Sequence, residues 1–99
     1  VEFRSADASA SPYLALAAIV FAGVDGIRHG RELPGTAEAV APLPPTLDAA
    51  LDLLEATDAA HDWFGPDFLD AYLRHKRAEV AMTADMDDGA RCAAYAEVY

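Results

Sequence analysis

Two side chains that could take part in chemistry, Glu2 and Arg4, stand two residues apart at the start of this 99-residue sequence. Side chains alternate between the two faces of a strand, so the pattern predicts Glu2 and Arg4 on one face and Val1 and Phe3 on the other. The result is a carboxylate beside a guanidinium. On spacing alone, such a pair is more often a surface ion pair of little energetic value than part of a functional site. The surrounding sequence has to decide between the two.

Two acidic segments have spacings that metal sites also use. Asp58, His61 and Asp62 recur at three and four residues, which places them on one face of a helix. An exposed polar face is the commoner meaning of that spacing, because metal sites need further ligands and a second shell of partners. Residues 85–89 faintly resemble a calcium loop, but the later spaced oxygens and the terminal glutamate are missing. We expect a polar helix face in the first segment and a turn with a helix cap in the second.

The remaining reactive side chains give little sign of catalysis. His29 and His75 stand near basic residues and are expected on the surface. Cys92 is the single cysteine, so no disulfide forms within the chain, and a reducing cytoplasm is the expected compartment. We expect no catalytic thiolate there. The sequence also has no Gly-rich phosphate loop, nucleophile elbow or zinc-binding pattern.

Bulk composition restricts the class of protein further. The chain is 54% apolar with a mean hydropathy of +0.08, so its composition is not that of a disordered protein. Its length suits one domain or part of one. Seventeen acidic residues against seven basic ones give a formal charge of −10. That charge disfavours binding to nucleic acid or to an anionic membrane surface, and its simplest role is solubility.

The elements that must position the opening pair are a strand over residues 1–5 and a helix over residues 12–29. Ser11 can cap this helix with its hydroxyl group. Pro12 suits the first turn, because it has no N–H group to leave unpaired. The strand therefore leads through a short bend directly into the helix.

The helix over residues 12–29 is apolar on every side. It carries no charge over residues 13–24 and has no polar stripe, so it should be covered by protein all round. The uncharged run is shorter than the ~20 residues that span a bilayer. The rest of the chain is amphipathic and too small to cover it. We expect an N-terminal segment upstream of Val1, or other subunits, to do so.

A connector and a helical tail come next. Residues 31–45 contain four of the six prolines, so a helix cannot continue through them. The tail, residues 46–99, begins at Thr46, a good N-cap, and is interrupted at residues 63–66. The apolar positions that recur at helical spacing, and that we expect to be buried, are Leu47, Leu51, Leu54, Phe68, Leu69, Tyr72 and Leu73.

The last segment of the tail, residues 90–99, is expected to form a short helix whose first turn begins at Asp87 or Asp88. Together these signals predict one N-terminal β-strand and then about four helices. The segment is therefore mostly α in class.

The opening residues resemble a segment of the glutamine synthetase family. That family's pattern is Glu-x-Arg, a short bend containing Asp, and Ala-Asn-Pro-Tyr leading into a long apolar helix. Here the corresponding residues are Glu2, Arg4, Asp7 and the run 10–13. Weaker matches continue in the family's order, and they are Ala22-Gly23-Val24-Asp25-Gly26-Ile27, Leu43-Pro44, Leu54-Glu55, Phe64-Gly65 and Lys76-Arg77-Ala78-Glu79.

The resemblance implies a role for each residue of the opening pair. Glu2 stands where the family places a carboxylate ligand of one of its two divalent metals, Mg²⁺ or Mn²⁺. Arg4 stands where the family places a catalytic arginine that contacts glutamate and the transferred phosphoryl group. The implied whole is the C-terminal part of an α+β catalytic domain. Its parent would be a cytoplasmic ligase of glutamine biosynthesis and nitrogen metabolism.

The implied reaction joins glutamate to ammonia or to a small amine at the expense of ATP, through a γ-glutamyl phosphate. The parent is expected to form a homo-oligomeric ring. The remaining metal, ATP and ammonium ligands of the family lie upstream of the position of Val1, so we expect these 99 residues alone to be inactive. The alternative is a small acidic helical module for interaction or oligomerisation, in which Glu2 and Arg4 are only a surface pair.

The chain departs from the family pattern in the bend and in the connector. Ser11 replaces the usual Asn, but serine also caps helices, so the bend should survive. The connector lacks the Asn-Leu-Tyr-Asp-Leu-Pro stretch in which some bacterial members are adenylylated, so we expect no such control. The short connector and the helix that contains Lys76-Arg77-Ala78-Glu79 are more similar to relatives that join glutamate to amines other than ammonia.

Overall fold

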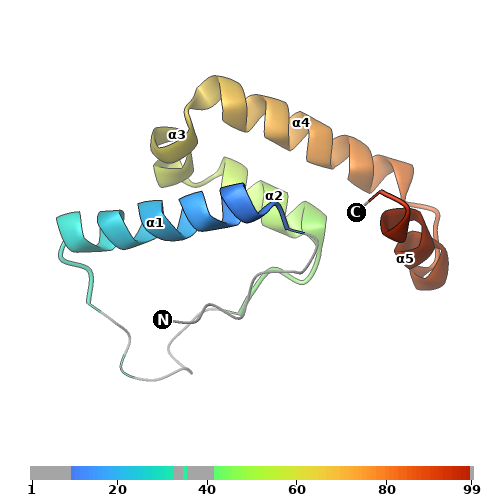
Figure 1. The fold of residues 1–99 in the computed structure, drawn as a ribbon, viewed down its shortest axis with the longest axis horizontal. Coiled ribbons are helices and arrows are strands. Elements are labelled where there is room, and N and C mark those ends of the chain that lie inside the picture. Colours follow the sequence, from blue (N-terminus) through green and yellow to red (C-terminus); the bar gives the residue numbers. More distant parts are fainter. Residues whose placement is uncertain (1–9, 33–34, 36–41, 99) are drawn as a thin grey trace. The chain divides into compact units, whose positions relative to one another are not determined.

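The computed structural model describes residues 10–32, residue 35 and residues 42–98. The chain divides into two units, Val1–Ala41 and Pro42–Tyr99. The described ranges hold five α-helices and no strand (Figure 1). The mostly α class is therefore confirmed for these ranges. The strand predicted over residues 1–5 lies outside them.

The first unit contains one described helix, α1, which spans Pro12–Arg28. Proline occupies its first turn as predicted, and the amide of Ala15 donates to the carbonyl oxygen of Ser11 at 2.9 Å. The hydroxyl of Ser11 makes no capping hydrogen bond, so the predicted side-chain cap is wrong. Because proline removes one of the first unpaired N–H groups, this helix start has one donor fewer to satisfy.

The C-terminal end of α1 is closed by backbone hydrogen bonds around a glycine. Gly30 has a φ of +59°, a left-handed conformation that costs glycine little. This turn lets the amide of Arg31 donate to the carbonyl oxygen of Gly26 at 3.0 Å. The sequence placed the end of the helix at residue 29, and the structure makes His29 the first residue after the helix.

The surface of α1 is largely apolar, and its residues are exposed or half-buried among the residues that the structure describes. None of its residues is buried, and Tyr13 and Ile27 are 85% and 83% exposed. An all-apolar helix gains free energy only when its surface leaves water. The covering of α1 by further protein, expected from the sequence, stays a prediction.

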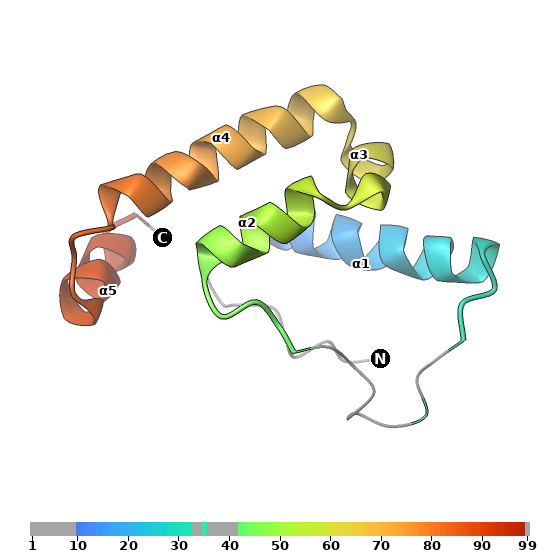
Figure 2. The same ribbon diagram turned by 180° about the vertical axis from the view of Figure 1, so that it is seen from behind.

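The second unit packs three helices around a small core. They are α2 (Leu47–Glu55), α3 (Asp58–Phe64) and α4 (Pro66–Met82). Helix α2 runs beside α4, and α3 joins the two at one end (Figure 2). As predicted, Thr46 caps α2, because its Oγ1 accepts a hydrogen bond from the amide of Ala49 at 3.2 Å.

Helix α3 is a separate element that the sequence did not distinguish from its neighbours. Helix α2 ends at Glu55, with Ala56 as its C-cap, and Thr57 adopts an extended conformation before α3 begins. The break predicted at residues 63–66 is confirmed. Gly65 has a φ of +79°, which favours glycine, and Pro66 then starts α4.

The core of this unit consists of four buried side chains, Leu51, Ala60, Leu69 and Leu73. Three of them were predicted from helical spacing, and Leu54 and Tyr72 are partly buried against them. Two predicted positions are wrong, because Leu47 is 40% and Phe68 44% exposed. Leu47 is the first residue of α2, at the edge of the packed region. Phe68 lies instead in a row of rings, with centroids 5.9 Å from Phe64 and 6.2 Å from Tyr72.

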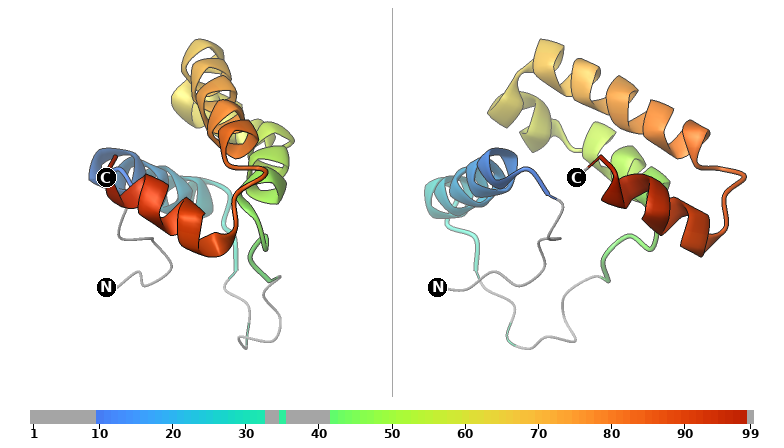
Figure 3. Two further views of the ribbon diagram at one scale, coloured as in Figure 1. Left: turned by 90° about the vertical axis from the view of Figure 1, so that its right-hand side faces the viewer. Right: turned by 45° about the vertical axis from the view of Figure 1, so that its right-hand side comes forward.

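Helix α5, Asp88–Ala96, comes after α4 and a turn (Figure 3). Asp87 caps it, since its Oδ1 accepts a hydrogen bond from the amide of Ala90 at 2.8 Å. The turn and helix cap predicted for residues 85–89 are therefore confirmed. No residue of α5 is buried, and an ion pair of 3.0 Å joins Arg91 to Asp88 within the helix.

Candidate functional site

The candidate site residues of the sequence, Glu2 and Arg4, lie outside the described residues, as does the Asp7 bend. Their predicted roles stay predictions. The structure does describe the adjoining segment of the chain, from Ala10 into the first turn of α1. Seven residues separate Arg4 from the helix start at Pro12. The predicted site residues are therefore close in sequence to a helix whose two ends the structure describes.

A polar cluster closes the far end of that helix. The carboxylate of Asp25 accepts a hydrogen bond from Nε of Arg31 at 2.8 Å and lies 3.0 Å from Nδ1 of His29. The hydrogen bond from Arg31 lowers the pKa of Asp25, partial burial opposes that shift, and the positive charges of Arg31 and His29 add to it. His29 Nδ1 also lies 3.0 Å from the carbonyl oxygen of Asp25. This arrangement satisfies a helix end and holds no group poised for catalysis.

The side chains with metal-like spacing do not form a cluster. Asp58, His61 and Asp62 are all exposed, as expected for a polar helix face. Nε2 of His61 lies 3.0 Å from the carbonyl oxygen of Glu55, at the end of α2. In the ranges that the structure describes, no three His, Cys, Asp or Glu side chains are grouped so as to hold a metal ion.

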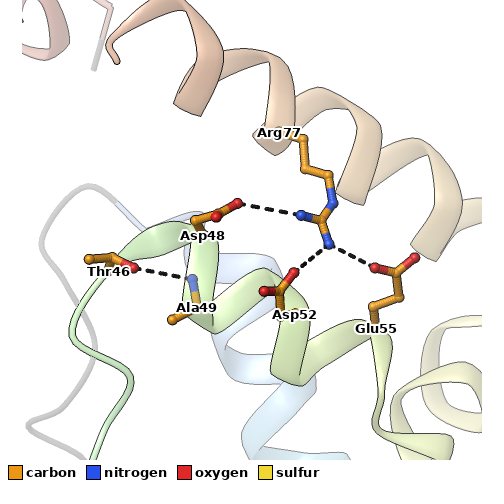
Figure 4. A network of polar contacts seen from close by, with 6 residues as sticks. All are labelled: Thr46, Asp48, Ala49, Asp52, Glu55 and Arg77. Carbon is orange, nitrogen blue, oxygen red and sulfur yellow. Dashed lines mark hydrogen bonds and ion pairs between the residues drawn. The ribbon is translucent and has the colours of Figure 1, made fainter. Parts of the chain in front are cut away.

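A polar network between α2 and α4 centres on Arg77 of α4 (Figure 4). Its Nη2 donates to Oδ1 of Asp52 at 2.9 Å and to Oε2 of Glu55 at 2.7 Å, and its Nη1 lies 3.4 Å from Oδ1 of Asp48. Hydrogen bonds to Asp52 and then Glu55 raise the pKa of Arg77 above its ordinary value. The three carboxylates follow one another at spacings of four and three residues along α2, but nothing in the sequence indicated their shared partner.

Neighbouring bases of α4 are also paired with acids. Arg74 bonds Asp70 at 2.8 Å, and both His75 and Lys76 contact Glu79, at 3.1 and 2.9 Å. With Arg77 held by α2, the basic run 74–77 is neutralised from within its own unit. Such a run offers little net attraction to a phosphate or to nucleic acid. The polar contacts of this unit are therefore structural.

No helix in the described ranges is both long and apolar enough to cross a bilayer. Cys92 is free and exposed on α5.

Comparison with known proteins decides the family. Residues 1–89 match the model of the glutamine synthetase catalytic domain. The chain belongs to the glutamine synthetase family. The match confirms the resemblance seen in the sequence, and its range includes both Glu2 and Arg4.

Individual members of the glutamine synthetase family resemble the chain over most of its length. A glutamine synthetase of Streptomyces coelicolor is 39% identical over 93 residues, which cover 79% of this chain and 20% of that enzyme. A glutamine synthetase of Mycobacterium tuberculosis is 34% identical over 95 residues, covering 82% and 21%. A gamma-glutamylpolyamine synthetase of Streptomyces coelicolor is 28% identical in an alignment of 109 positions, which covers 96% of this chain and 23% of that protein. The chain thus spans about a fifth of the length of these relatives. No solved structure matches it significantly.

Proposed function

We propose that the chain is the C-terminal part of the catalytic domain of an ATP-dependent ligase that joins glutamate to ammonia or to a small amine. The observation that supports this most strongly is the family match over residues 1–89. It takes in the Glu2–Arg4 pair, the bend and the apolar helix α1 in one continuous segment. The relatives named as glutamine synthetases and as a gamma-glutamylpolyamine synthetase support the two choices of acceptor.

The proposed reaction has two steps. The side-chain carboxylate of glutamate attacks the γ-phosphorus of ATP, so that a γ-glutamyl phosphate forms and ADP leaves. The nitrogen of ammonia or of an amine then attacks the acyl carbon, inorganic phosphate leaves, and the nitrogen loses a proton. Charge builds on phosphoryl oxygens in the first step, and a planar guanidinium at Arg4 would donate hydrogen bonds to them.

Glu2 is the residue of this chain proposed to hold a divalent metal. A carboxylate supplies the hard oxygen ligand that Mg²⁺ and Mn²⁺ prefer, and the metal would neutralise phosphate charge. One carboxylate is far from a complete coordination sphere, and no three His, Cys, Asp or Glu side chains of the described residues are grouped so as to hold a metal ion. The other ligands are proposed to come from the part of the catalytic domain that precedes these residues in the family.

The helices are proposed to brace this site. A strand of residues 1–5 would carry Glu2 and Arg4 on one face, and α1 would anchor it against the rest of the catalytic domain. The largely apolar surface of α1, none of whose residues is buried among the described residues, supports this, since burial stabilises at about 25 cal/mol per Å² of apolar area. The parent is proposed to work as a homo-oligomeric ring, and these 99 residues alone are proposed to be inactive.

The deciding experiment is ATP hydrolysis by the full-length parent with Mg²⁺ and glutamate. Phosphate release would be measured with ammonia and with a panel of small amines that includes polyamines. Release that depends on one amine would support the ligase and identify its acceptor. No release with any amine, from a folded oligomer, would instead support a member of the family that has lost its activity or serves a purely structural role.

Two conservative variants test the residue roles in the same assay. Glu2→Gln removes the charge of the proposed metal ligand, and the expected result is a large loss of kcat that added Mn²⁺ restores in part. Arg4→Lys keeps the charge but loses bidentate donation, so kcat should fall more than KM rises. Glu97→Gln and Arg28→Lys are matched controls on exposed positions and should leave activity unchanged. Activity of Glu2→Gln equal to that of Glu97→Gln would refute the assignment.

A further inference from the structure

We draw no further inference here: the strongest candidate, the uncharged apolar surface of helix α1 over residues 13–24, carries none because nothing in the structure shows what covers it.

Discussion

Leu69→Ala should unfold the three-helix packing of α2, α3 and α4. Leu69 is 1% exposed and belongs to a core of only four buried side chains. The substitution removes three side-chain carbons, each worth about 0.8 kcal/mol on burial. A residual cavity adds to that loss, and measured Leu→Ala changes in cores cost roughly 2–5 kcal/mol. We therefore expect a loss of about 3 kcal/mol.

A loss of that size matters because the unit is small. A single core in a domain below about 70 residues seldom supplies more than ~3–5 kcal/mol of net stability. Leu69→Ala should therefore leave α2, α3 and α4 largely unfolded at 25 °C, whereas the wild-type chain should show a cooperative transition in urea. The measurement is urea unfolding of the 99-residue chain, monitored by circular dichroism at 222 nm and by amide hydrogen exchange.

Leu53→Ala is the matched control. Leu53 lies on α2, which packs against the helix that carries Leu69, but it is 58% exposed, so its truncation should cost well under ~1 kcal/mol. Hydrogen exchange should show lost protection in α4 for Leu69→Ala and retained protection for Leu53→Ala. Equal urea midpoints for the two variants would refute the assignment of Leu69 to the core.

Three further predictions concern polar contacts. Arg77→Met keeps most of the aliphatic stem but leaves three carboxylates of α2 without their shared partner, so the urea midpoint should fall below that of the wild-type chain. Because salt screens exposed charges, 1 M NaCl should reduce the difference in urea midpoint between the two chains. Arg74 pairs only with Asp70 of its own helix in the contacts described above, so Arg74→Met should lower the urea midpoint less. Because the pKa of Asp25 is lowered in the folded chain, its contribution to the stability of α1 is complete above the unfolded pKa and is lost as pH falls through the lowered value. Carboxyl NMR should place this titration below the ordinary value of 3.8, and Arg31→Gln should move it upward. Asp87→Ala should cost α5 about 1 kcal/mol, seen as faster amide exchange in its first turn.

Each of these predictions has an outcome that contradicts it. If 1 M NaCl left the difference in urea midpoint between the wild-type chain and Arg77→Met unchanged, the network would make no net electrostatic contribution to stability. If Arg31→Gln left the pKa of Asp25 unchanged, the hydrogen bond from Arg31 would not be the cause of its lowered pKa. Unchanged exchange at Ala90 in Asp87→Ala would mean that the observed cap contributes nothing to α5.

The candidate site could be predicted only from pattern. By their spacing alone, Glu2 and Arg4 are indistinguishable from a common surface ion pair. What marks them as candidate site residues is the helix start that follows at Pro12, together with the family's order of residues. Their distances, burial and partners depend on segments that a local pattern does not describe. Metal coordination in particular needs ligands from several elements at once.

What the sequence by itself determined is local structure and family. The cap at Thr46, the break at Gly65 and the cap at Asp87 were predictable, because each signal acts within one helical turn. Leu51, Leu69 and Leu73 were predictable as core from their helical spacing.

Only the tertiary structure decided which of these elements meet. Arg77 reaches carboxylates 22 to 29 residues earlier in the chain, and no local rule selects them. The same packing leaves Leu47 and Phe68 exposed although their spacing predicts burial, and it inserts α3 as a separate helix. The physical reason is that burial and ion pairing depend on how helices cross, whereas a helix begins and ends through contacts between residues a few positions apart.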